Sequence, residues 1–62
     1  MSELSKELLA LWKDYLKYVE LELEKIDAYD MSSYGKQVIK SGRRKGMINI
    51  ESFFEWLEEE QG

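Results

Sequence analysis

The longest stretch without a helix-breaking residue lies at the start of the chain, because no glycine or proline occurs before Gly35. Leucine, lysine, glutamate and alanine dominate residues 2–27, and all four are good helix formers. Ser2 is a suitable N-cap, and Glu3 places an acid in the first turn, where the helix dipole favours negative charge. The sequence therefore predicts one long helix near residues 3–27.

Apolar residues follow two stripes along this segment. The first repeats with alternating spacings of three and four, as in a coiled-coil seam: Leu9, Trp12, Leu16, Val19, Leu23 and Ile26. The second runs beside it: Leu4, Leu8, Leu11, Tyr15 and Tyr18. The combined face is wider than one neighbouring helix covers. Two alternatives follow: both stripes pack inside one small domain, or the second stripe is the shared interface of a homodimer.

The last part of the chain predicts a helix near residues 50–60. Ile50, Phe53, Phe54 and Leu57 stand at i, i+3, i+4 and i+7, with Trp56 on the flank. Asn49 is a natural N-cap directly before them. We expect the core to consist of Trp12, Leu16, Val19, Leu23, Ile26, Phe53, Phe54 and Leu57.

The middle segment, residues 30–48, allows two interpretations. Asp30 or Ser32 could cap a short helix that presents Met31, Tyr34 and Val38 on one side. Alternatively, residues 38–40 and 47–48 could form two short strands joined by a glycine-flanked basic turn. The two could also combine, as a short helix followed by a glycine-flanked basic turn. The expected fold is therefore mainly α: one small three-helix domain over residues 1–62, with a short irregular middle helix to which a short β-hairpin wing could be added.

Composition argues against catalysis. The chain of 62 residues contains no cysteine and no histidine, which excludes disulfides, thiolate chemistry, Cys/His zinc sites and histidine-based triads. No Walker or dinucleotide-binding glycine pattern is present. We expect neither an enzyme nor a cofactor, metal or small-molecule substrate. No apolar run approaches the ~18 residues of a membrane span and no signal peptide is visible, so the cytoplasm is the expected compartment.

Charge is strongly segregated along the chain. Residues 1–30 carry four lysines and eight acids, a net charge of −4. Residues 31–48 carry five cations and no acid, and residues 49–62 carry five acids and no base. The five cations are Lys36, Lys40, Arg43, Arg44 and Lys45. Such a cluster is typical of a segment that contacts nucleic-acid phosphates, and the two arginines are the strongest candidates. The alternative is a solvated segment that neutralises acidic neighbours within the fold.

Residues 38–57 combine two features: the basic Ser41–Gly46 run and, after it, Ile48, Glu51, Phe53, Glu55, Trp56 and Leu57. This pattern resembles the end of an excisionase-type winged helix. In that family, which is related in fold to MerR-like domains, a basic hairpin wing precedes a helix that packs beneath the recognition helix. The resemblance implies that Arg43, Arg44 and Lys45 lie on a wing at the DNA, and that Lys36 and Lys40 end the recognition element.

Two functions are therefore expected from the sequence. The first is a small, phage-like DNA-binding accessory protein that contacts double-stranded DNA through residues 36–45. The second is a small acidic protein-interaction module, such as an inhibitor or assembly factor, with no nucleic-acid role. The acid-free block at residues 31–48 supports the first, whereas the acidic flanks and the wide apolar face support the second.

Overall fold

Three α-helices make up the fold, and no strand is present in residues 2–61, the part that the computed structural model describes (for residue 61, the backbone alone). Helix α1 spans Glu3–Glu24 and continues into a 3₁₀ turn, η1, at Lys25–Ala28. Helix α2 spans Ser33–Met47, and helix α3 spans Ile50–Gln61. The predicted all-α, three-helix fold is confirmed.

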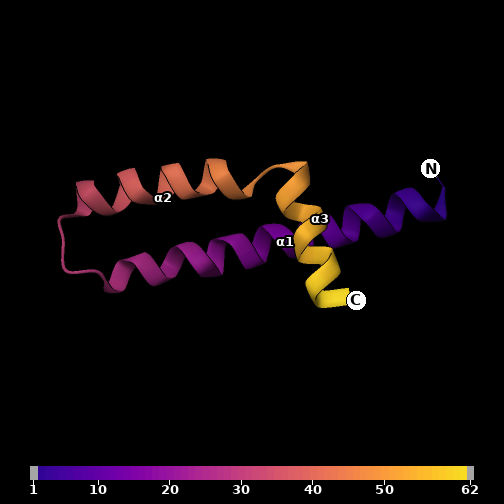
Figure 1. Cartoon of the computed structure of the whole chain (residues 1–62), viewed down its shortest axis with the longest axis horizontal. Coiled ribbons are helices and arrows are strands. Elements are labelled where there is room, and N and C mark those ends of the chain that lie inside the picture. Colours follow the sequence, from indigo (N-terminus) through magenta and orange to yellow (C-terminus); the bar gives the residue numbers. More distant parts are fainter. Residues whose placement is uncertain (1, 62) are drawn as a thin grey trace.

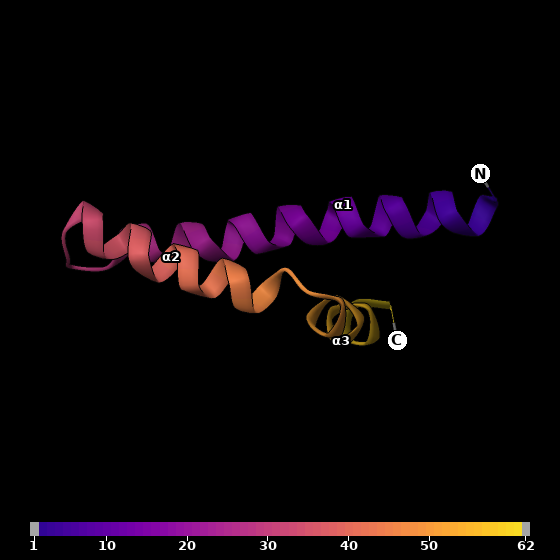
Figure 2. The same ribbon diagram turned by 90° about the horizontal axis from the view of Figure 1, so that it is seen from above.

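Helices α1 and α2 lie side by side and run in opposite directions (Figure 1). Helix α3 crosses α1 steeply after a short turn that follows α2 (Figure 1). In Figure 2, α2 and α3 lie on the same side of α1. The first turns of α1 extend past α3 toward the N-terminus, so no other helix covers them (Figure 1).

Each helix begins at a polar cap that its sequence supplies. The Ser2 hydroxyl accepts a hydrogen bond from the Ser5 backbone N–H at 3.2 Å, and Ser32 accepts one from Gly35 at 3.1 Å. The Asn49 side-chain oxygen accepts from the Ser52 backbone N–H at 2.8 Å. These bonds satisfy amide groups that have no partner inside the first turn of a helix.

The middle segment forms the helix and not the hairpin, and at 15 residues α2 is longer and more regular than the sequence predicts. A hairpin turn over residues 41–46 would use glycine at positive φ, but no glycine among the described residues adopts it. The helix instead brings Ile39 and Met47, two turns apart, against the core. It also places Arg44 and Lys45 in the last turn, where the helix dipole favours positive charge.

The core is small and comes almost entirely from the first helix. Its buried members are Tyr15, Val19, Leu23, Ile26 and Phe53. The side chains that pack against it are only partly buried: Leu11, Trp12, Tyr18, Ile39, Met47, Trp56 and Leu57. Burial of so few residues leaves a domain of this size only marginally stable.

The buried core differs from the expected one, and the predicted core residues Trp12 and Leu57 pack against it but are only partly buried. Tyr15 is buried, although the second stripe was interpreted as a shared interface, whereas Leu16 is half-buried outside the core cluster. Phe54 is 50% exposed. The cause is the crossing of α3, which places Phe53 over Trp12 and Tyr15 and turns the neighbouring Phe54 outward.

None of the helices in the described part of the chain has the length and apolar character needed to cross a membrane.

Candidate functional site

All five cations of the basic block lie on α2. The expectation that residues 41–46 form a basic wing is wrong, because these residues are the last turns of the helix. Gly42 and Gly46 each cost a helix about 1 kcal/mol relative to alanine. Contacts that α2 makes with α1 offset this cost, and the basic side chains provide several of them.

Arg44 pairs with Glu20 on α1. Its Nε donates to Glu20 Oε1 at 3.2 Å, and its Nη2 donates to Oε2 at 3.2 Å, so the guanidinium holds the carboxylate through two parallel hydrogen bonds. This fork geometry is the one that an arginine would offer to a phosphate. The predicted phosphate-binding group is therefore already bound to a carboxylate of the same chain.

Two lysines of α2 bind Asp27 at the end of η1. Lys40 Nζ donates to the Asp27 carboxylate at 2.7 Å, and Lys36 Nζ donates to the Asp27 backbone carbonyl at 2.8 Å. The hydrogen bond from Lys40, followed by the charges of both lysines, holds the pKa of Asp27 below its ordinary value, although desolvation opposes them. These contacts lie at the surface, so each contributes little stability by itself.

The remaining two cations differ from each other. The Arg43 guanidinium lies 5.8 Å from the centre of the Tyr29 ring, a cation–π contact across the end of the helical hairpin. Lys45 is exposed and makes no ion pair, hydrogen bond or ring contact within the described residues. Four of the five cations thus contact α1, η1 or the segment that follows, and the structure joins them to acids and to one aromatic ring of the same chain.

The acids of α3 present the opposite situation. The helix carries five acids and no base: Glu51, Glu55, Glu58, Glu59 and Glu60. Every ion pair among the described residues lies within α1, η1 and α2: Glu22 with Lys25, Asp27 with Lys40, and Glu20 with Arg44. None of these five acids therefore forms an ion pair with a cation of the described residues.

The orientation of α3 follows from its ring contacts. The Phe53 ring packs on Trp12 at 5.1 Å and on Tyr15 at 5.5 Å. Trp56 packs on Tyr15 at 5.4 Å and on Tyr18 at 6.2 Å, one turn further along α1. The Trp56 side of α3 consequently faces the later turns of α1, and the opposite side of α3 faces the first turns.

That opposite side carries exposed apolar residues. Ile50 and Phe54, one turn apart on α3, are 64% and 50% exposed. Leu4 and Leu8 share the face of α1 that Tyr15 occupies further along, but they precede the crossing of α3 and remain exposed. We call Leu4, Leu8, Ile50 and Phe54 the apolar corner.

The residues expected at a homodimer interface are divided by the structure. Leu4 and Leu8 are exposed, whereas Leu11 and Tyr18 pack partly against the core. The assignment of Tyr15 to a shared surface is wrong, because its ring is buried and its hydroxyl donates to the backbone carbonyl of Met47. The sequence did not identify Ile50 and Phe54 as exposed apolar residues, since both belong to an i, i+3, i+4 pattern that is typical of a buried face.

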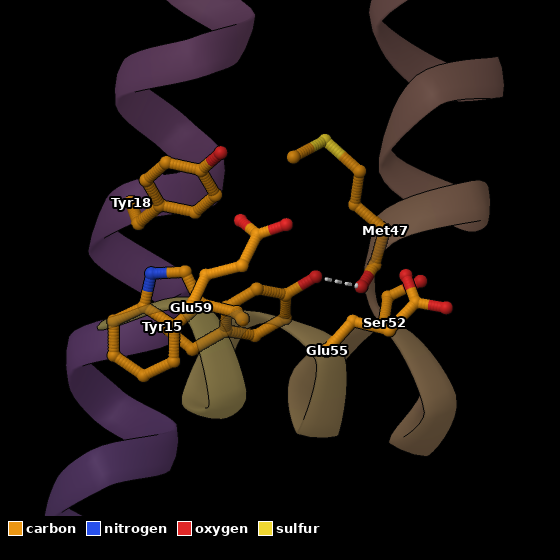
Figure 3. Close-up of a pocket in the computed structure, with 7 residues that line it drawn as sticks. Tyr15, Tyr18, Met47, Ser52, Glu55 and Glu59 are labelled. Atoms are coloured by element: carbon orange, nitrogen blue, oxygen red, sulfur yellow. Dashed lines mark hydrogen bonds between the residues drawn. The ribbon is translucent and has the colours of Figure 1, made fainter. Parts of the chain in front are cut away.

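A second feature that the sequence did not reveal is a small pocket of about 190 Å³ on the Trp56 side of α3 (Figure 3). Its lining comes from all three helices: Tyr15, Tyr18, Met47, Ser52, Glu55, Trp56 and Glu59. Burial raises the pKa of Tyr15, and the charges of Tyr18 and Glu55 raise it further, while the nearby Ser52 side chain opposes the increase. Glu55 and Glu59, which lie one turn apart beside Trp56, are the sequence pattern from which this pocket could have been predicted.

Comparison with protein-family models, with curated proteins and with solved structures finds no match for this chain. The resemblance of residues 38–57 to excisionases therefore stays a prediction. No group of three or more carboxylates within the described residues is arranged to hold a metal ion.

Proposed function

We propose that this chain is a small protein-interaction module that binds a basic, amphipathic segment of another protein across α3 and the first turns of α1. The observation that carries the proposal is the charge of α3: five acids, none of which forms an ion pair with a cation of the described residues. A partner that supplies lysine or arginine would neutralise these acids.

The apolar corner gives the partner a second kind of contact. Phe54 and Glu58 lie one turn apart on α3, and Glu51 lies one turn before Phe54, so apolar and acidic groups alternate on the same surface. An amphipathic helix with leucine-like residues on one face and lysine at its edges matches this pattern, as in other helix-in-groove complexes.

The same geometry favours this function over DNA binding through residues 36–45. To contact a phosphate, Arg44 would have to break its hydrogen bonds with Glu20, and Lys40 would have to break its hydrogen bond with Asp27. Each contact with DNA would therefore be formed at the loss of a contact within the fold. A duplex would also experience repulsion from the acids of α3.

Fluorescence anisotropy with a labelled amphipathic peptide of leucine and lysine tests the proposal, and the equivalent peptide of leucine and glutamate is the control. We expect saturable binding of the first peptide alone. Changing Ile50 and Phe54 to serine, or Glu51 and Glu58 to glutamine, should weaken it.

The matched control variant combines Leu21→Ser with Glu24→Gln, which makes the same kinds of change on an exposed part of α1 away from the corner. It should bind the leucine–lysine peptide as the unmodified chain does. Equal binding of the two peptides, or an equal loss in the control variant, would contradict the proposed surface.

A further inference from the structure

The pocket beside Trp56 offers aromatic faces and carboxylates within one concave space (Figure 3). The rings of Tyr15, Tyr18 and Trp56 lie in mutual contact, with centroids 5.4–6.2 Å apart. Glu55 and Glu59, one turn apart on α3, complete the lining. Its volume of about 190 Å³ is below the ~300–1,000 Å³ of pockets for drug-sized ligands, so it suits a single side chain.

Hydrogen bonding inside the pocket favours a donor from outside. The Tyr15 hydroxyl donates to the Met47 carbonyl, and the Ser52 hydroxyl donates to the Gly46 carbonyl at 3.1 Å. Both of these protons are therefore engaged within the fold. The Glu55 and Glu59 carboxylates have only acceptor atoms, and neither takes part in an ion pair among the described residues.

The aromatic rings and carboxylates of the pocket together favour a positively charged ligand group. Aromatic faces attract a cation through the ring quadrupole, and the attraction strengthens as the cation loses water. Two carboxylates beside those rings add a direct Coulomb attraction. Burial is the main cause of the raised pKa of Tyr15, and the nearby charge of Glu55 adds a smaller increase.

We propose that this pocket receives the ammonium end of a lysine side chain from the partner that binds α3, an inference that rests on the proposed function. An ammonium is a compact point charge on a flexible stem, whereas the guanidinium fork of an arginine pairs with the two oxygens of a single carboxylate. The three rotatable donors of an ammonium can reach Glu55 and Glu59 while its methylene groups contact the rings.

Two-dimensional NMR of the full chain, titrated with Nα-acetyl-lysine amide, tests the site. We expect shifts confined to the Trp56 indole and to the signals of Tyr15, Tyr18, Glu55 and Glu59. The Nε-acetylated compound, which lacks the charge, should produce none of these shifts. Changing Glu55 and Glu59 to glutamine should weaken the affinity about tenfold or more, the loss expected when a charge-assisted hydrogen bond is removed.

Asp14→Asn with Glu24→Gln is the matched control, because it removes the same charge from exposed positions of α1 outside the pocket. The control should keep the affinity for Nα-acetyl-lysine amide. Equal losses in the two double variants, shifts spread over all the acids, equal binding of the neutral compound, or tighter binding of Nα-acetyl-arginine amide would each overturn the assignment.

The outcome also separates this inference from the proposed function. If the leucine–lysine peptide binds the unmodified chain and the Glu55/Glu59 variant equally, the lysine pocket is refuted and the interaction module stands. If the lysine derivative binds in the pocket but the peptide does not bind, the proposed function is refuted, and with it the assignment of the lysine to a partner protein.

Discussion

Phe53 and Phe54 are adjacent and identical in kind, yet the structure assigns them very different contributions to stability. Phe53 is 3% exposed and lies between Trp12 and Tyr15. Truncating a buried phenylalanine to alanine costs about 3–5 kcal/mol, because the contacts are lost and a cavity is left. Phe54 is 50% exposed. Since full burial of such a side chain is worth about 1.5–3 kcal/mol, its truncation should cost about 1 kcal/mol.

These costs are large relative to the stability of the chain. At ~0.05–0.15 kcal/mol per residue, 62 residues give about 3–9 kcal/mol in total. Phe53→Ala should therefore remove between about a third and all of this stability, whereas Phe54→Ala should remain folded. Urea unfolding followed by far-ultraviolet circular dichroism measures both.

Where Phe53→Ala has no folded baseline, Phe53→Leu provides one, since it retains an apolar side chain in the same position. Phe53→Leu should still lower the unfolding midpoint more than Phe54→Leu does. Equal losses at the two positions would refute the orientation of α3 on which the apolar corner depends.

Three further predictions concern α2 and its contacts. Gly42→Ala and Gly46→Ala should each stabilise the fold by about 0.5–1 kcal/mol, measured as a higher thermal midpoint, because a Cβ at either position meets open space in a regular helix. A double-mutant cycle with Arg44→Ala and Glu20→Ala should give a coupling free energy of about 0.2–1 kcal/mol in urea unfolding, and a value of zero would show that the pair does not form in solution. The folded-state pKa of Asp27 is lowered mainly by its hydrogen bond with Lys40, so its contribution to stability is present above the unfolded-state pKa and is lost as pH falls through the folded value. In Lys40→Gln the pKa of Asp27, followed by carbon-detected NMR titration, should return toward its ordinary value, and an unchanged pKa would contradict the contact.

The positions of the helices could be predicted from the sequence because caps and spacing are local signals. Ser2, Ser32 and Asn49 each cap a helix as their position before an apolar repeat indicates. Val19, Leu23, Ile26 and Phe53 are buried as their spacing predicts. These features depend on neighbours within one or two turns.

The exposed apolar residues of the apolar corner could not be predicted from periodicity, because their exposure depends on where α3 crosses α1. The same repeat that buries Phe53 leaves Phe54 exposed, and the stripe that contains Leu4 and Leu8 becomes core at Tyr15. A periodic pattern gives the face of a helix. It does not give the length of that face that a second helix covers.

The role of the basic block depends on contacts that are distant along the chain. Arg44 and Glu20 are 24 positions apart, and Lys40 and Asp27 are 13 apart. They meet because α1 and α2 run antiparallel, which fixes their register (Figure 1). Glycines at both ends of residues 42–46 suggested a turn, but glycine also occurs within helices when the contacts of the helix offset its cost.

We infer that the cations of α2 stabilise the fold instead of binding a nucleic acid. Titration of fluorescent duplex DNA at two salt concentrations tests it directly, with the unmodified chain beside the double variant Arg43→Ala, Arg44→Ala. We predict no saturable binding by either protein, and a lower unfolding midpoint for the variant. Binding that weakens as salt rises, with a slope of about 0.9 in log affinity for each phosphate contact, and that the double variant loses, would contradict the claim.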